Sequence, residues 1–188
     1  MTIYITFLRG INVGGKNKVK MSDLKRVLES IGLVRVETYI QSGNVIFESN
    51  ETEDSLRKRI EAEIESNFGF SAVVVLRTAE ELEALIQDCP FSFEEIKAAE
   101  TANSEGESFY VALLPQVPTQ EKIELLNPFH GEADEYRIKK RDIYLLFRHS
   151  IRNSKLAINL QKLDVPATVR NWKTMTKLYE QTKARLNG

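Results

Sequence analysis

The chain is poor in the residues that disulfides and metal sites require. It holds one cysteine, Cys89, and two histidines, His130 and His149, in 188 residues. A single cysteine excludes an internal disulfide and is typical of a protein from a reducing cytosol. One cysteine and two histidines at these positions make no metal-ligand spacing, so we expect no metal site.

Long apolar runs are also missing. The longest, such as residues 72–76, are far too short to cross a bilayer, and residues 1–7 are typical of a strand rather than a signal segment. We therefore expect a cytoplasmic protein with no membrane partner. A hydrophobic content of 42% and a charged content of 28% are typical of a globular protein with one domain or two small ones.

Catalytic motifs are absent as well. The sequence contains no Walker A motif, dinucleotide fingerprint or nucleophile elbow. Ser154 precedes Lys155, but adjacent residues of a helix point in different directions, which argues against a Ser-Lys dyad. We expect no cofactor, and the sequence identifies no catalytic residue.

The net charge of −1 conceals a strong separation of charge along the chain. Six cations and one anion lie within residues 9–26, whereas nine acidic residues and one lysine lie within residues 80–107. Residues 137–188 carry thirteen cations and three anions. This asymmetry indicates an anionic partner or two halves that attract each other, although solvated faces also collect charge.

Helices and strands alternate regularly in the first half. Strands are expected over residues 3–8, 36–41, 45–49 and 71–77, and helices over residues 22–30 and 52–68. Ser22 is the expected N-cap of the first helix, and Gly32 and Gly69 are the expected helix stops. The order β-α-β-β-α-β predicts a ferredoxin-like unit.

The second half follows the same order less strictly. Strands are expected over residues 109–114, 135–138 and 143–147, and helices over residues 78–88, 119–126, 154–163 and 168–186. Residues 91–106 show no clear period and are expected to form a loop with one helical turn. The prediction is an α+β protein of two ferredoxin-like (βαββαβ-type) subdomains with antiparallel sheets and a helical C-terminus. We place the N-terminal subdomain at residues 1–77 and the C-terminal one, with its acidic connecting segment, at residues 78–188.

The segment after the first strand is the most informative part of the chain. Residues 9–20 hold three glycines, two asparagines and four cations. Glycines let backbone N–H groups face a guest without an intervening Cβ, and the cations make that guest anionic. Ile11 and Val13 indicate that the loop packs against the fold. The alternative is a flexible connection whose lysines serve solubility.

Three other polar segments are candidates for the same surface. Ser42 and Asn44 lie at a hairpin turn, where they either serve turn geometry or offer neutral hydrogen bonds to a ligand. Residues 148–155 and 168–174 place cations at expected helix starts, which costs a few tenths to about 1 kcal/mol each unless an anion binds there. Exposed charges also tolerate this cost in physiological salt.

The only tryptophan, Trp172, lies within the last of these segments. With Val169, Met175 and Tyr179 it forms a stripe at helical spacing. This pattern favours burial of the ring against the sheet over a stacking platform for a nucleic-acid base.

Four sequence segments together resemble the uncharacterised bacterial family called domain of unknown function 1697. They read LRGINVGGKNKVKM, YIQSGNVIF, NSKL and TVRNWKTMTKL. The resemblance covers nearly the whole chain and implies an α+β protein built from ferredoxin-like subdomains. It implies no established activity, substrate or cofactor. The residues that mark the family are 9–18, 41–44, 154–156 and 170–174, which are the polar segments already described.

We expect a cytoplasmic module that binds an anionic ligand, either a phosphorylated small molecule, a nucleotide or a nucleic acid, at a basic surface. The candidate ligand-binding residues are Arg9, Asn12, Lys16, Lys18, Ser42, Asn44, Ser154, Lys155, Arg170, Asn171 and Lys173. One alternative is a metal-independent enzyme that acts on a phosphorylated or nucleotide-like substrate. The other is a structural or oligomerising protein whose basic C-terminal half docks on the acidic residues 80–107.

Overall fold

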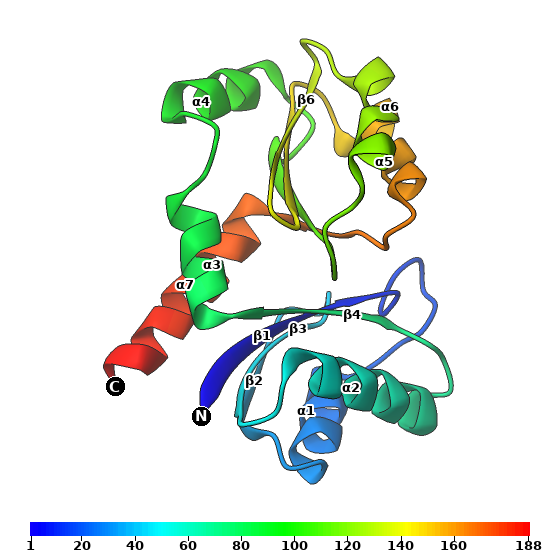
Figure 1. The fold of residues 1–188 in the computed structure, drawn as a ribbon, viewed down its shortest axis with the longest axis vertical. Helices are drawn as coiled ribbons and strands as arrows, with labels where there is room; N and C mark the ends of the chain where they lie inside the picture. The colour runs from blue at the N-terminus through cyan, green and yellow to red at the C-terminus, as the bar shows by residue number, and fades with distance from the viewer. The chain divides into compact units, whose positions relative to one another are not determined.

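The chain divides into two compact units in the computed structural model, which describes all residues from Met1 to Gly188. Unit 1 comprises Met1–Ala84 and Lys177–Gly188, and unit 2 comprises Leu85–Thr176. Each unit contains one four-stranded antiparallel sheet (Figure 1). No helix combines the length and the apolar character that a membrane span requires.

Unit 1 has the predicted order of elements. They are β1 (Thr2–Arg9), α1 (Met21–Ser30), β2 (Val34–Tyr39), β3 (Asn44–Ser49), α2 (Glu53–Phe68) and β4 (Val73–Thr78), followed by α3 (Ala79–Gln87). The sheet order is β2-β3-β1-β4, with every neighbouring pair antiparallel. Figure 1 shows α1 and α2 on one face of this sheet. This is the ferredoxin-like arrangement, and the prediction is confirmed.

The core of unit 1 forms because strand residues alternate and helix residues recur at helical spacing. Tyr4, Leu8, Phe47 and Val74 of the sheet pack with Leu24 and Leu28 of α1 and with Leu56, Ile60 and Ile64 of α2. Thr52 caps α2 by accepting a hydrogen bond from Ser55 N–H, and Gly69 ends it at φ 77°. Both ends of α2 therefore follow from the sequence.

The start of α1 differs from the prediction. The helix begins at Met21, with Lys20 in the N-cap position and no side chain capping it. Asp23 N–H and Leu24 N–H both donate to Lys20 O, which places Ser22 inside the first turn. The prediction of a Ser22 cap is wrong because Met21 packs against the core and belongs to the apolar side of the helix.

Unit 2 repeats the ferredoxin-like order in a shorter form. Its elements are α4 (Phe93–Ala102), β5 (Phe109–Leu113), α5 (Gln120–Glu124), β6 (Asp134–Lys139), β7 (Asp142–Phe147), α6 (Lys155–Asn159) and β8 (Thr168–Asn171), with 3-10 turns at Asn127–Phe129, Ile151–Asn153 and Leu160–Leu163. The sheet order is β6-β7-β5-β8. Leu126, Leu156, Leu160 and Leu163 cover the apolar face formed by Ala112, Ile143, Leu145 and Phe147. The α+β prediction of two such subdomains is confirmed.

The last strand of unit 2, β8, occupies residues for which the sequence pattern predicts a helix. Residues Thr168–Asn171 pair with β5, from Leu113 opposite Thr168 to Tyr110 opposite Asn171. The final helix, α7, spans Trp172–Asn187. Asn171 caps it, because its Oδ1 accepts from Thr174 N–H at 2.8 Å. A four-residue strand that runs directly into a helix leaves no break in the apolar pattern, and only its pairing with β5 reveals it.

The predicted loop at residues 91–106 contains the ten-residue helix α4. Ser92 and Glu95 form a capping box, in which Glu95 N–H donates to Ser92 Oγ at 3.1 Å and Ser92 N–H donates to Glu95 Oε2 at 2.7 Å. This reciprocal pair satisfies two of the unpaired N–H groups at the helix start. The loop prediction is wrong because the S-x-x-E capping signal at Ser92 and Glu95 starts a helix even though residues 91–106 show no clear apolar period.

Trp172 packs against the sheet of unit 2. Its ring centroid lies 4.6 Å from that of Phe109 and 6.3 Å from that of Tyr144. The predicted packing of Trp172 against the sheet is confirmed, although Val169 lies in β8 and not on the same helix.

Candidate functional site

The connection between β1 and α1 forms a small, ordered finger. Lys16 N–H donates to Val13 O at 3.0 Å across Gly14 and Gly15, whose φ angles are 58° and 75°. Two positive φ angles are the mark of a type I′ turn, which glycine adopts without strain. Asn12 N–H donates to Asn17 O at 3.0 Å and extends this miniature hairpin. We call residues 9–20, which begin with the last residue of β1, the basic finger.

One side chain, Asn12, closes the base of the basic finger. Its Nδ2 donates to Val19 O at 2.9 Å and to Gln41 O at 2.8 Å, and its Oδ1 accepts from Val19 N–H at 2.8 Å. These bonds occupy the Asn12 amide, so its role in the fold is to position the finger. The bond to Gln41 also joins the finger to the β2–β3 turn.

The β2–β3 turn packs directly on the basic finger. Leu8 N–H donates to Gly43 O at 2.9 Å. A Cβ added at Gly43 would lie 2.5 Å from Ile11 Cδ1, so only glycine fits. Asn44 is buried and donates to Tyr39 O and to Ser42 Oγ, both at 3.0 Å. The structure thus brings the finger and the Ser42–Asn44 turn together, and it gives Asn44 a role in shaping the turn.

The cations of the basic finger differ from most of those elsewhere in unit 1, where Lys183 also has no carboxylate partner but lies over the Tyr179 ring. The paired cations are Lys25, Arg26, Arg35, Arg57, Lys58, Arg59, Lys177 and Arg185, each of which has a carboxylate within ion-pair distance. The exposed side chains of Arg9, Lys16, Lys18 and Lys20 form no ion pair and no hydrogen bond. The first carboxylate after Arg9 along the chain is that of Asp23, and Arg26 binds it at 2.9 Å. Positive charge therefore accumulates on the finger without local compensation.

A hollow of about 670 Å³ lies beside the finger. Lys18, Lys20, Asn12, Gln41, Ser22 and Asp23 supply its polar groups, and Val19, Met21 and Phe68 supply its apolar wall. Two cations and an apolar surface within one hollow suit an anion that also carries a flat or apolar portion.

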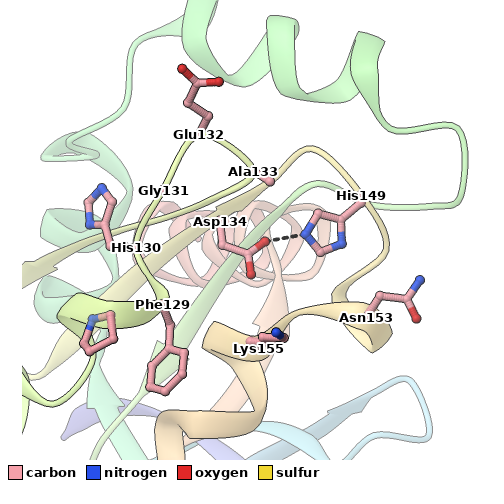
Figure 2. A pocket seen from close by; sticks show the side chains of 10 residues that line it. Phe129, His130, Gly131, Glu132, Ala133, Asp134, His149, Asn153 and Lys155 are labelled. Atoms are coloured by element: carbon pink, nitrogen blue, oxygen red, sulfur yellow. Dashed lines mark hydrogen bonds and ion pairs between the residues drawn. The ribbon is translucent and has the colours of Figure 1, made fainter.

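A different polar cluster lies in unit 2, where β6 begins (Figure 2). The Asp134 carboxylate, with 8% of the residue exposed, accepts a hydrogen bond from Ser154 Oγ at 2.8 Å. His149 Nε2 lies 2.5 Å from the other carboxylate oxygen, and His149 Nδ1 lies 3.1 Å from Ser150 O. Ser154 is fully buried and also caps α6 by accepting from Ala157 N–H. This network joins β6 to the segment that leads into α6.

A cavity of about 380 Å³ opens beside this network. His149, Asp134, Asn153 and Lys155 line it together with residues 128–133. Figure 2 shows His149 turned toward Asp134, with Glu132 and His130 pointing away from that pair. Lys155 is exposed and forms no ion pair.

The order of groups in this network does not make a nucleophile. A Ser-His-Asp triad needs the histidine between the serine and the carboxylate, so that imidazole removes the hydroxyl proton. Here Asp134 lies between Ser154 and His149, and the Ser154 hydroxyl is inaccessible to a substrate. The cluster therefore lacks the order of groups that a catalytic triad requires, and its hydrogen bonds join β6 to the start of α6. No group of three or more histidine, cysteine or acidic side chains is placed to hold a metal ion.

The remaining predicted residues lie where β8 joins α7. Arg170 belongs to a strand, its Nη1 donates to Val169 O, and burial lowers the pKa of its guanidinium to about 10. The helix-start argument therefore does not apply to Arg170. Asn171 is the cap of α7, and Lys173 is exposed in the first turn. Ser154 and Asn171 thus have capping roles.

Basic and acidic segments do meet within unit 2, through residues that were not predicted. Arg137 makes two hydrogen bonds to Glu95, at 2.6 and 3.1 Å, and lies 4.0 Å above the Phe91 ring. Lys139 donates to Asp88 O at 2.5 Å. The Arg137 guanidinium and the Ser92 N–H lower the pKa of Glu95 to about 2. This ion pair attaches the start of α4 to the β6–β7 hairpin.

The family model described as "Protein of unknown function (DUF1697)" matches residues 1–144. The chain belongs to this DUF1697 family. A solved structure with a similar fold is that of the conserved bacterial protein SP0830 from Streptococcus pneumoniae, at a TM-score of 0.73 and 27% identity, with 96% of this chain and 98% of that chain covered. No curated protein matches the chain. The family and the neighbour supply a fold and no activity.

The DUF1697 match includes the basic finger and the β2–β3 turn, whereas Ser154 and Arg170 lie beyond its last residue. Sequence reasoning missed Lys20, Asp134 and His149 as members of polar clusters. Lys20 was visible as the fourth cation of the finger. Asp134 had no sequence signal, and His149 lies within the predicted segment 148–155 without a predicted partner, because only the pairing of β6 with β7 brings the two together.

Proposed function

We propose that the chain is a cytoplasmic binding module that holds an anionic ligand at the basic finger of unit 1. The observation that carries this proposal is the contrast in charge pairing. Eight cations of unit 1 have a carboxylate partner, and the four on the finger have none.

Electrostatics favours a ligand at such a place. Four like charges within one short loop repel each other, and at an effective dielectric constant near 20 two charges 8 Å apart interact by about 2 kcal/mol. Salt screens part of this repulsion. A bound anion replaces part of this repulsion with attraction between the anion and the cations. Cations that serve only solubility do not need to be held in an ordered hairpin.

The ordered backbone supports the same proposal. Asn12 and the Gly43 contact hold the finger, so its cations are presented without a large loss of loop entropy on binding. Lys18, Lys20, Ser22 and Gln41 face one hollow and would contact the ligand. Asn12 and Asn44 position these groups through their hydrogen bonds to the finger and to the β2–β3 turn.

An NMR titration of the ¹⁵N-labelled protein with sodium pyrophosphate tests the proposal. We expect the amide signals of Gly14, Gly15 and Lys18 to Ser22 to shift in a saturable way. The double variant Lys18→Gln/Lys20→Gln should lower the affinity at least tenfold. Lys25→Gln/Lys58→Gln is the matched control, since it removes two exposed lysines that already have carboxylate partners.

Three outcomes of the titration would refute the proposal. It fails if pyrophosphate, phosphate and nucleotides leave the finger amides unmoved, or if the control variant loses as much affinity as Lys18→Gln/Lys20→Gln. Shifts confined to Asn153 and Lys155 would move the site to the cavity of unit 2 and would also refute it.

A further inference from the structure

We infer that the ligand of the basic finger is a single-stranded nucleic acid rather than a small phosphorylated molecule. This inference rests on the proposed function and goes further by naming the chemical class of the ligand. It depends on where the four cations lie relative to the hollow and on what else the hollow offers.

The cations extend well beyond the hollow. Lys18 and Lys20 line it, whereas Arg9 and Lys16 line no part of it. Lys16 belongs to the tip of the finger, and Arg9 ends β1 at its base. A small phosphate bound in the hollow would leave Arg9 and Lys16 uncompensated. A chain of phosphates that passes through the hollow and along the finger would reach all four.

The spacing of the lysines suits a repeating anion. Lys16, Lys18 and Lys20 are two residues apart; two residues of fully extended chain span about 6.6 Å, and the bend at Asn17, whose φ is 49°, makes the first of these spacings shorter. The row from Lys16 to Lys20 therefore reaches up to about 13 Å. Separate phosphates along a flexible strand can each meet one lysine, which is the pattern that backbone-tracking nucleic-acid proteins use.

The hollow offers groups for an unpaired base. Met21 and Phe68 provide apolar surface, and the exposed Gln41 side-chain amide has no partner within the fold. Val13, at the tip of the finger, leaves 66% of its surface exposed and presents a further apolar contact. Bases of a single strand can turn into such a hollow, whereas those of a duplex remain stacked inside it. These groups favour a single strand.

Fluorescence anisotropy with a labelled 12-nucleotide oligo(dT) tests the inference across salt concentrations. With four phosphates neutralised, the plot of log affinity against log salt should have a slope of about −2.8, which is a loss of about fifty-fold between 50 and 200 mM salt. Lys16→Gln should reduce the magnitude of the slope by about 0.7. Lys25→Gln should leave it unchanged, and Gln41→Ala should weaken binding about threefold or more at constant slope.

The outcomes separate this inference from the function on which it rests. If thymidine monophosphate or pyrophosphate binds as tightly as the oligonucleotide, and Lys16→Gln has no effect, the inference fails and the proposed function stands. If a 12-base-pair duplex binds as tightly as the single strand, the assignment to single strands is wrong. If no anion binds at the finger, both proposals fail.

Discussion

The two units share one fold but differ in the connection that follows their first strand. In unit 1 this connection is the basic finger, with lysines at positions 16, 18 and 20. In unit 2 it is residues 114–119, Leu-Pro-Gln-Val-Pro-Thr, which carry two prolines and no cation. The β6–β7 turn of unit 2 is also reduced to Lys140 and Arg141. The sheet and helices are therefore a common scaffold. The candidate site lies in the unit whose first connection is longer and carries the cations.

The units also differ in how they treat polar groups. Unit 2 buries a carboxylate and a hydroxyl and joins them to a half-buried imidazole, and all three groups are hydrogen-bonded to protein groups. Unit 1 leaves its distinctive polar groups exposed on the finger. A buried and satisfied network stabilises a fold, whereas exposed and unpaired charge is available to a ligand. Four variants test this difference between the units, from the largest expected effect on stability to the smallest.

Gly43→Ala should destabilise unit 1 most. The new Cβ would lie 2.5 Å from Ile11 Cδ1 and 2.9 Å from Leu8 Cβ, at a φ of 83°. We expect a loss of about 2–4 kcal/mol, measured by urea unfolding. Gly10→Ala is the control, because its φ is 91° and nothing lies within 4 Å of the new Cβ. It should cost only about 1 kcal/mol. Equal losses for the two variants would show that the turn does not depend on close packing.

Asp134→Ala should destabilise unit 2 by about 2–3 kcal/mol. The substitution leaves the buried Ser154 hydroxyl without its acceptor and removes the partner of His149 Nε2. Thermal unfolding followed by circular dichroism measures the loss. Glu132→Ala, which removes an exposed carboxylate from the same cavity, should change stability by less than about 0.5 kcal/mol. Similar values for both would exclude a structural role for the network.

Glu95→Gln tests the attachment of α4 through pH. Because Arg137 and Ser92 lower the folded-state pKa of Glu95 from 4.5 to about 2, the carboxylate contributes stability that is fully present above about pH 4.5. That contribution is lost as pH falls from about 4.5 to about 2. The wild-type protein should therefore exceed Glu95→Gln in stability at pH 6, and the difference should shrink through this window. A difference that stays constant with pH would mean that the ion pair does not stabilise unit 2.

Much of the fold follows from local signals. The caps at Thr52 and Gly69 and the period of Leu56, Ile60 and Ile64 define α2 without any tertiary information. The capping box of α4 is equally local, since Ser92 and Glu95 are three residues apart in the sequence. Strand β8 is different, because Thr168–Asn171 becomes a strand only by pairing with β5, which lies more than fifty residues earlier in the sequence.

The candidate site divides in the same way. The glycines and lysines of the finger are adjacent in the sequence, so their accumulation of charge could be predicted. The amide bonds of Asn12 to Val19 and Gln41 could not, because they depend on how the finger folds back on the β2–β3 turn. The Asp134–His149 contact could not be predicted from the sequence either, since it depends on the register of β6 against β7.

Lys18→Gln/Lys20→Gln should have the smallest effect on stability. Neither side chain has a partner in the folded protein, so the free energy of unfolding should change by less than about 0.5 kcal/mol. Arg59→Gln gives the contrast: its guanidinium binds Glu51 and donates to Ile31 O at 2.6 Å, so it should cost about 1 kcal/mol. Urea titrations of both variants make the comparison. A loss for the lysine variant as large as that for Arg59→Gln would assign the finger cations to the fold.

The hydrogen bonds of Asn12 hold the base of the finger, so changes in the tip are not transmitted to the sheet. Residues 13–16 lie beyond the bonds of Asn12 and beyond that of Asn17, whose Nδ2 donates to Gly10 O at 2.7 Å. A change in the length or sequence of the tip should leave the thermal unfolding temperature of unit 1 unchanged. One example is a short peptide tag inserted between Gly14 and Gly15. If the proposed ligand binds at the finger, the same arrangement makes the tip the part of unit 1 where substitutions alter binding with the least effect on the sheet.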